Sequence, residues 1–173
     1  MVKNTQKYFW IIGGGILQVP LIKEAKKLNY KIIVTDADEN CICKELASCF
    51  ETIDIFDIDG HIEYAKQLTN SGILIKGVLA AGIDAPETMA KVAEMLNLPT
   101  VSSKIAHLVN NKEIFRVKMK ELGVPTPKFQ SVSINNLDEL PSIIDKIGYP
   151  LIVKNTSSSG SRGTKIFYSH DIV

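Results

Sequence analysis

The feature that most constrains the fold is an alternation of short apolar runs with longer stretches of helical periodicity. Residues 8–12 form an apolar run rich in aromatic and β-branched side chains, glycines follow, and residues 19–28 then carry apolar side chains at near-helical spacing. A second apolar run covers residues 31–35 and ends at Asp36. A strand, a tight turn, a helix and a second strand within about 30 residues make a βαβ unit.

The same alternation continues along the chain and predicts a parallel sheet. Further elements are expected as helices near residues 44–47, 61–69 and 86–96, and as strands near residues 50–53 and 77–80. Strands that alternate with helices pair in parallel, and the helices cover the faces of the sheet. The predicted fold class is therefore α/β, with a Rossmann-like parallel-sheet domain over residues 1–109.

A second, smaller domain is expected over residues 110–173. Its predicted elements are a linker helix over 112–122, a strand near 128–132, a helix over 140–147, and strands at 151–154 and 164–168 on either side of a polar loop. Fewer than about 70 residues rarely supply an independent core. We therefore expect this part to be the incomplete start of an α+β domain.

Composition argues against two classes of partner. The chain has 20 Lys plus Arg against 19 Asp plus Glu, so it has no basic excess with which to neutralise a nucleic-acid backbone. Its longest apolar stretch, residues 8–22, falls short of the roughly 20 residues of a membrane span and is interrupted by glycines.

The cysteines Cys41, Cys43 and Cys49 lack zinc-site spacing and indicate free, buried thiols in a reducing cytoplasm.

The glycine turn after the first strand partly matches a dinucleotide-binding fingerprint. Gly13, Gly14 and Gly15 supply the turn, but Gln18 stands where G-x-G-x-x-G requires its third glycine. Asp36, about 20 residues further on, occupies the place of a ribose-binding acid. One interpretation is an NAD-binding oxidoreductase. The other is a tight strand-to-helix turn that binds no ligand.

A more informative pattern lies between the last two predicted strands. The first of these strands ends at Lys154, and a loop rich in Ser and Gly follows it. The central residues of this loop are Ser157, Ser158, Ser159, Gly160, Ser161, Arg162 and Gly163. Successive backbone N–H groups in such a loop can bind phosphate oxygens. The alternative is a mobile hairpin tip beside a lysine in solvent.

Two acidic residues follow the fourth predicted strand. Asp84 and Glu87 lie at the carboxyl end of the sheet, where open α/β sheets bind their ligands, so both are candidate substrate contacts. Their D-x-x-E spacing around Pro86 also predicts a capping box at the start of the next helix. The capping box explains both residues without a substrate and is the preferred interpretation.

Taken together, these motifs resemble the ATP-grasp superfamily, specifically its carboxylate–amine ligases related to the large subunit of carbamoyl phosphate synthetase and to biotin carboxylase. The motifs occur in order along nearly the whole chain. They are Ile12 to Gly15, Val34 to Asp38, Lys76 to Leu79, Asn111 with Lys112, Leu122 to Pro127, and the strand ending at Lys154 with its loop.

The resemblance implies a pre-ATP-grasp domain followed by the truncated start of an ATP-binding domain. It assigns Lys112 and Lys154 to the nucleotide phosphates, residues 157–163 to a lid over them, and the glycine turn to a structural or substrate-facing role. The implied reaction uses ATP and Mg²⁺ to phosphorylate a small carboxylate, and an amine or ammonia then attacks the acyl phosphate. The catalytic residues and metal ligands would lie beyond residue 173, so none is expected within this chain.

The resemblance also implies a cytoplasmic enzyme of which this part alone is inactive, and a homo-oligomer is compatible with it. Neither a nucleic acid nor a membrane is expected as a partner. A third interpretation is a non-catalytic module that binds a nucleotide or a partner protein through the open edge of its unfinished sheet.

Overall fold

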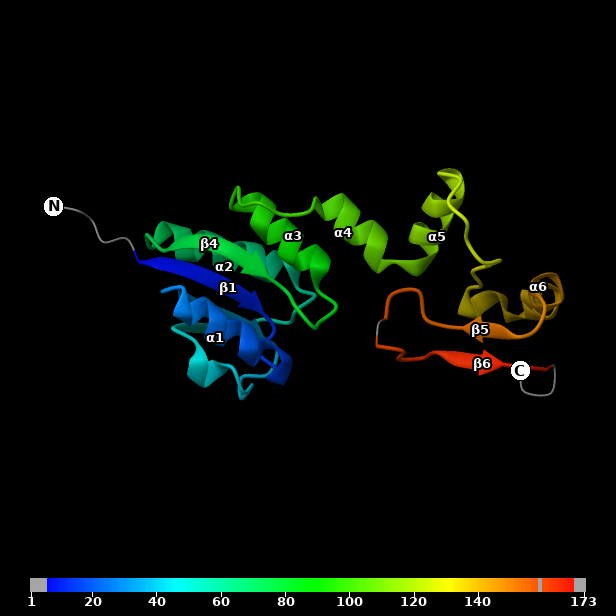
Figure 1. Ribbon diagram of the computed structural model, residues 1–173, viewed down its shortest axis with the longest axis horizontal. Helices are drawn as coiled ribbons and strands as arrows, with labels where there is room; N and C mark the ends of the chain where they lie inside the picture. The colour runs from blue at the N-terminus through cyan, green and yellow to red at the C-terminus, as the bar shows by residue number, and fades with distance from the viewer. Residues whose placement is uncertain (1–5, 159, 170–173) are drawn as a thin grey trace. The chain divides into compact units, whose positions relative to one another are not determined.

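The chain folds into two compact units. The computed structural model describes residues 6–158 and 160–169, and the two units divide between His107 and Leu108, inside helix α4 (Ser103–Asn110). The first unit holds a parallel sheet, and the second holds an antiparallel pair of strands (Figure 1).

The first unit is built on four parallel strands in the order β3-β2-β1-β4. The strands are β1 (Lys7–Ile12), β2 (Lys31–Asp36), β3 (Cys49–Thr52) and β4 (Leu74–Leu79). β1 and β2 occupy the centre of the sheet and read as nearly continuous apolar runs, because both of their faces are covered. The parallel pairing confirms the predicted Rossmann-like α/β class.

Helices connect these strands, and the main ones lie close to their predicted positions. They are α1 (Val19–Lys27), α2 (Ile58–Asn70) and α3 (Pro86–Met95). Short 3₁₀ turns precede α1 and β3, at η1 (Ile16–Gln18) and η2 (Lys44–Leu46). The predicted helix near 44–47 is therefore a single 3₁₀ turn.

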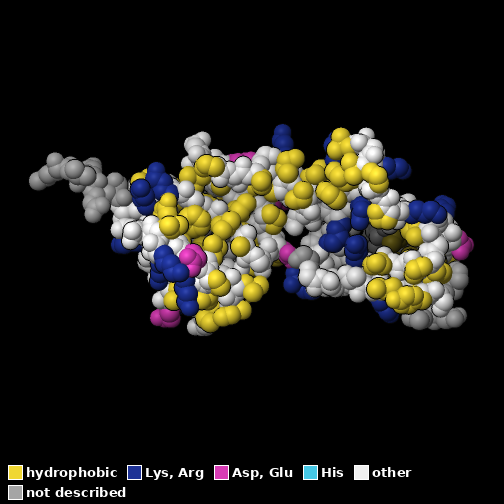
Figure 2. All heavy atoms as spheres, in the orientation of Figure 1, with side chains coloured by type: hydrophobic (Ala, Val, Ile, Leu, Met, Phe, Trp, Pro, Cys, Tyr) yellow, Lys and Arg dark blue, Asp and Glu magenta, His cyan; other side chains and the backbone are white. Residues whose placement is uncertain are grey.

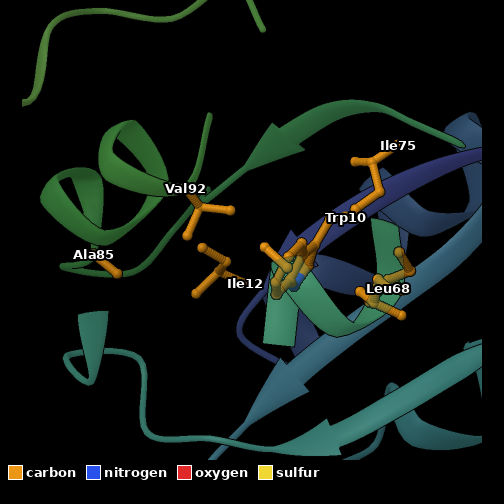
Figure 3. Packing of buried hydrophobic residues seen from close by; sticks show 8 residues of the cluster. Trp10, Ile12, Leu68, Ile75, Ala85 and Val92 are labelled. Carbon is orange, nitrogen blue, oxygen red and sulfur yellow. The ribbon is translucent and has the colours of Figure 1, made fainter. Parts of the chain in front are cut away.

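The side chains of β1 alternate between two separate cores. Ile11 packs with Ile22 of α1 on one face, while Trp10 and Ile12 pack with Val92 of α3 on the other. Figure 3 shows Trp10 and Ile12 on this second face. Each fully buried side chain of this size contributes about 1.5–3 kcal/mol through removal of apolar surface from water.

A hydrogen-bonded chain of polar groups crosses this second core. Trp10 Nε1 donates to Thr35 Oγ1 at 3.1 Å, and Thr35 Oγ1 lies 3.0 Å from His61 Nε2. His61 Nδ1 lies 2.7 Å from the carbonyl oxygen of Asp57, which can only accept, so Nδ1 carries the proton. Thr35 then donates to Nε2 of a neutral imidazole. Burial lowers the pKa of His61 and favours this neutral form.

The second unit begins in α4 and continues with shorter elements around a small core. They are α5 (Lys112–Glu121), η3 (Ile134–Glu139), α6 (Leu140–Ile147), β5 (Leu151–Val153) and β6 (Lys165–Phe167). β5 and β6 pair antiparallel, and Ile144 of α6 packs against Leu151 and Phe167 on one side of the pair. The opposite side carries Ile152 and Ile166, which face each other across the strands and are about half exposed.

One predicted strand of this unit is wrong. Residues 128–132 are irregular in the structure. A strand needs a neighbour to complete its ladder of backbone hydrogen bonds, and among the described residues β5 and β6 pair only with each other. The presence of Phe129 and Val132 among polar residues is therefore not sufficient to make the segment a strand.

Candidate functional site

The first turn of α5 contacts the loop that follows β5. The backbone N–H of Lys112 donates to the carbonyl oxygen of Thr156 at 2.9 Å. The ammonium group of Lys112 also donates to the carbonyl oxygen of Ser158. Because Thr156 is two residues after Lys154, the structure brings both predicted phosphate-binding lysines to the base of the same loop.

Asn111 fixes the direction in which α5 starts. Its side-chain oxygen accepts from the backbone N–H groups of Glu113 at 3.0 Å and Ile114 at 3.1 Å, so it is the N-cap of the helix. Together with the Lys112 contact to Thr156, these bonds use the first amides of α5 within the protein. A phosphate group near this helix end would therefore be bound by the Lys112 side chain rather than by the helix amides.

The loop itself contains several residues with left-handed backbone. Gly160, Ser161 and Gly163 have φ of 61°, 60° and 67°. Asn155 Oδ1 accepts from the N–H of Ser157 at 2.8 Å, and Ser158 Oγ donates to the carbonyl oxygen of Arg162 at 2.9 Å. These bonds fold the loop back on itself.

Two members of the predicted phosphate-binding set stand apart from these contacts. Ser159 lies outside the described residues. Lys154 is exposed and makes no ion pair within the described part of the chain. The Lys154 ammonium is thus available to an anion, whereas an anion at Lys112 would have to replace the carbonyl of Ser158.

The backbone amides of Gly13 and Gly14 in the glycine turn already donate hydrogen bonds within the protein. The N–H of Gly13 donates to the carbonyl oxygen of Thr35 at 2.7 Å, and the N–H of Gly14 donates to Asp36 Oδ2 at 2.6 Å. A Cβ atom on Gly14 would lie 2.3 Å from the sulfur of Cys41, which shows how closely that side chain covers the turn.

Asp36, the acid that would bind a ribose, also forms hydrogen bonds within the protein. Asp36 Oδ1 accepts from the N–H of Asp38 at 2.9 Å, so both of its carboxylate oxygens already hold backbone amides. The amides and the acid that a dinucleotide would need are therefore used to close the turn. This arrangement does not favour the NAD-binding alternative.

Gln18, which replaces the third glycine, joins the glycine turn to the loop after β4. Its side chain is 1% exposed, and its amide nitrogen donates to the carbonyl oxygen of Ala81. A Cβ atom on Gly13 would lie 2.9 Å from Cδ1 of Ile83, which belongs to the same loop. The structure thus brings the glycine turn and the loop leading to Asp84 together at the carboxyl edge of the sheet.

The preferred capping box at α3 is wrong. The N-cap of α3 is Ala85 rather than Asp84, and its side chain makes no capping hydrogen bond. Glu87 instead lies with Oε2 2.9 Å from Nδ1 of His107 on α4. Pro86 is the first residue of the helix, a position for which its ring is pre-set, so the N-cap is the residue directly before it.

Several of these contacts could not be found by motif reasoning. The Ser158 carbonyl that meets Lys112 is a backbone atom, and the bond joins residues 46 positions apart. The pairing of Glu87 with His107 depends on how α4 packs on α3. Asn111 is the exception, because an Asn directly before a helix is a recognisable N-cap signal.

The three cysteines are free thiols in the structure, as predicted. Cys41 and Cys43 are buried and Cys49 is partly buried, and burial raises the pKa of all three thiols. Among the described residues, no helix has both the length and the apolar character needed to cross a bilayer.

Comparison with known proteins finds a family match for most of the second unit. Residues 111–173 match the family of the carbamoyl-phosphate synthase L chain, ATP binding domain. Lys112, Lys154 and the loop after β5 all fall within the matched residues.

Longer relatives match nearly the whole chain. The formate-dependent phosphoribosylglycinamide formyltransferase of Prochlorococcus marinus subsp. pastoris is 29% identical over 164 residues, which is 95% of this chain and 41% of that protein. The chain therefore spans about two-fifths of the length of the curated relatives that it matches.

Solved structures share the fold. N5-carboxyaminoimidazole synthetase from Staphylococcus aureus, complexed with ADP, aligns with a TM-score of 0.70 and 22% identity over 96% of this chain and 43% of that chain. The biotin carboxylase domain of the Hydrogenobacter thermophilus 2-oxoglutarate carboxylase, in complex with MgADP, ADP and bicarbonate, aligns with a TM-score of 0.65 and 19% identity over 92% of this chain and 37% of that chain. The chain thus matches an ATP-binding domain family over residues 111–173, and over nearly its whole length it shares the fold of these solved structures.

Proposed function

We propose that this chain supplies the phosphate-binding part of an ATP-dependent ligase that joins a small carboxylate to an amine or ammonia. The observation that carries the proposal is the contact between Lys112 and the loop after Lys154, inside the segment that matches an ATP-binding domain family. Two basic side chains at the base of a Ser- and Gly-rich loop are suited to a polyphosphate.

The two lysines have different parts in this proposal. Lys154 is exposed and meets an incoming phosphate group directly. Lys112 exchanges its bond with the Ser158 carbonyl for a bond to a phosphate oxygen, and that exchange frees the loop to close over the nucleotide. A closed loop would keep water away from an acyl phosphate, because water readily hydrolyses such an intermediate.

Magnesium would accompany the nucleotide in this proposal. Mg²⁺ is bound in such sites largely by substrate phosphates with one or two carboxylates, and it neutralises the charge that develops on them. Among the described residues, no three His, Cys, Asp or Glu side chains are grouped so that they could hold a metal ion. The contribution of the described residues is to bind and orient the phosphates.

The substrate is proposed at the level of a class. The curated relatives are formate-dependent phosphoribosylglycinamide formyltransferases, and their names describe a formyl transfer that uses formate, a small carboxylate, and a glycinamide acceptor. They favour a carboxylate and an amine over the more specific carbamoyl phosphate synthetase reaction. The glycine turn, Asp84 and Glu87 at the sheet edge remain candidate substrate contacts within this proposal.

Binding of MgADP to the 173-residue chain tests the nucleotide site. In two-dimensional amide NMR spectra of the labelled chain, we expect MgADP to shift the resonances of Lys112, Thr156 and Ser157. Lys112→Met and Lys154→Met should each weaken this binding at least about tenfold, as expected for loss of a charged contact to phosphate. Lys165→Met, which removes an exposed lysine from neighbouring β6, is the matched control and should leave the affinity unchanged.

Two results would overturn the proposal. One is an absence of any MgADP-dependent shift in the loop at millimolar nucleotide. The other is an equal affinity in the wild type and in both the Lys112→Met and Lys154→Met variants.

A further inference from the structure

A hollow lies in the second unit, and its lining includes neither Lys112 nor Lys154. It has a volume of about 460 Å³ and is bounded by the end of α5, the irregular segment 126–130, and the helical segment of η3 and α6. Figure 2 shows a recess in this unit with hydrophobic side chains at its floor and Lys or Arg side chains beside it. Its volume falls within the range of about 300–1,000 Å³ that is usual for small-molecule sites.

The hollow is lined by an excess of positive charge. Lys120, Lys128 and Lys146 reach it from three different segments, against a single carboxylate, Glu139. None of these lysines forms an ion pair within the described part of the chain. Three lysine side chains that line one hollow from separate elements, without an ion-pair partner among the described residues, attract an anion.

The acidic residues of the bounding elements differ in whether they line the hollow. Glu139 Oε1 accepts from the side-chain amide of Asn136 at 3.3 Å, within its own 3₁₀ segment. Asp138 and Asp145 lie on the same helical segment but do not line the hollow. Glu121 is paired with Lys118 at 3.0 Å. Among the residues that line the hollow, three lysines against one carboxylate leave an excess of two positive charges.

Apolar side chains form the rest of the lining. Phe129 contributes an aromatic ring that is partly exposed, and Ile143 and Ile147 of α6 contribute aliphatic surface. A cationic rim around an aromatic and aliphatic floor is complementary to a molecule that has an anionic group and an apolar body. A purely ionic ligand would leave the floor unused.

We propose that this hollow binds a small phosphate monoester with an aromatic or apolar body. Neither Lys112 nor Lys154 lines it, so it is distinct from the nucleotide-phosphate site and does not depend on the proposed function. The three lysines would hold the phosphate, and Phe129 would pack against the organic part.

Phenyl phosphate is the probe that tests this inference, with inorganic phosphate for comparison. Both would be titrated into the labelled 173-residue chain carrying Lys112→Met and Lys154→Met, so that binding at the first site is suppressed. We expect phenyl phosphate to shift the amide resonances of Phe129, Gln130 and Ser142, and to bind at least about fivefold more tightly than inorganic phosphate because it also buries apolar surface.

Added substitutions in the hollow separate a specific site from general attraction. Lys128→Gln with Lys146→Gln should weaken phenyl phosphate binding at least about tenfold. Lys23→Gln with Lys26→Gln removes the same number of charges from exposed positions of α1 and should leave the affinity unchanged. Circular dichroism would verify that each variant is folded.

Three outcomes would overturn the inference. Phenyl phosphate could leave the resonances of the hollow unmoved. The Lys128→Gln, Lys146→Gln variant could bind it as tightly as its parent. Equal affinities for phenyl phosphate and inorganic phosphate would show that the apolar floor takes no part.

Discussion

At the residue scale, the donor and the acceptor can be assigned for each hydrogen bond in the buried chain from Trp10 through Thr35 to His61. Each hydrogen has one available acceptor, because the Asp57 carbonyl can only accept and the indole nitrogen can only donate. A buried polar network is stabilising only when all of its members have partners. Removal of one member therefore affects the others.

His61→Phe should lower the unfolding free energy of the first unit by about 2–4 kcal/mol at pH 8, because the buried Thr35 hydroxyl loses its acceptor and the Asp57 carbonyl keeps only its bond to the backbone N–H of residue 61. Urea unfolding followed by tryptophan fluorescence would measure this change. His107→Phe removes an exposed histidine that forms one surface ion pair, and it should cost less than about 1 kcal/mol.

The same His61 variant makes a prediction about pH. Burial lowers the pKa of His61 from 6.5, so below pH 6.5 the unfolded state binds more protons than the folded state. The wild type should therefore lose stability as the pH falls through 6.5, while the variant lacks this contribution. The stability difference between the two proteins should shrink from pH 8 to pH 5, and a constant difference would contradict the assigned neutral imidazole.

Two adjacent glycines offer a matched test of how closely the turn is packed. A Cβ on Gly14 would lie 2.3 Å from the Cys41 sulfur and 3.2 Å from Asp36 Cβ, whereas a Cβ on Gly15 would meet only the Gln18 side-chain oxygen, at 3.3 Å. Gly14→Ala should cost about 1–3 kcal/mol of stability through overpacking, and Gly15→Ala should cost less than half as much. Equal thermal stabilities for the two variants would show that Cys41 moves aside freely.

At the element scale, α5 connects a capping residue to a proposed ligand contact. Asn111→Ala removes both N-cap bonds and should lower the stability of the second unit by about 1 kcal/mol. It should also weaken MgADP binding, because the first turn of α5 carries Lys112. Asn135→Ala, at an exposed position of η3, is the control. If Asn111→Ala destabilises the unit but leaves nucleotide affinity intact, Lys112 does not depend on the cap for its position.

The start of α4 depends on a carboxylate from α3. Glu94 Oε1 accepts from the backbone N–H of Ser103 at 2.7 Å, and this bond is the main cause of the lowered pKa of Glu94. Its stabilising effect is fully present above pH 4.5 and is lost as the pH falls through the folded-state pKa. Hydrogen exchange at the Ser103 amide should be faster in Glu94→Gln than in the wild type at pH 7. Equal exchange rates would mean that the carboxylate does not protect this amide.

Helices and strands were more predictable from the sequence than the polar contacts between them. Strands β1 and β2 and helix α1 follow directly from apolar periodicity, because burial on both sheet faces leaves a strong pattern. The strand expected at 128–132 failed because pairing depends on a partner strand. The Trp10, Thr35 and His61 chain and the Lys112 contact to Ser158 join residues far apart in sequence, so single-sequence patterns carry no signal for them.

At the scale of the whole molecule, the two units have very different cores. The first unit has two clusters of buried side chains, one on each face of its sheet. The second has one cluster, in which Ile144, Leu151 and Phe167 are the buried members. Because buried apolar area is the main source of stability, the second unit should be the weaker of the two.

Unfolding of the chain should therefore not be a single transition. The only tryptophan, Trp10, lies in the first unit and reports its unfolding alone. Far-ultraviolet circular dichroism detects helices and strands of both units, so its signal should begin to fall at lower urea concentration than the tryptophan fluorescence. Coincident curves would contradict this and would indicate that the units unfold together.

The order of these transitions also provides a test of where a nucleotide binds. A ligand stabilises only the part of a protein that it binds in the folded state, and the effect grows with ligand concentration. MgADP at about 100 times its dissociation constant should stabilise the second unit by about 2.7 kcal/mol. If the site consists of Lys112, Lys154 and their loop, the early phase seen by circular dichroism should move to higher urea while the Trp10 phase stays in place. If the glycine turn of the first unit held the nucleotide instead, the Trp10 phase would move, and the bonds that Gly14 makes with Asp36 would have to break for it to do so.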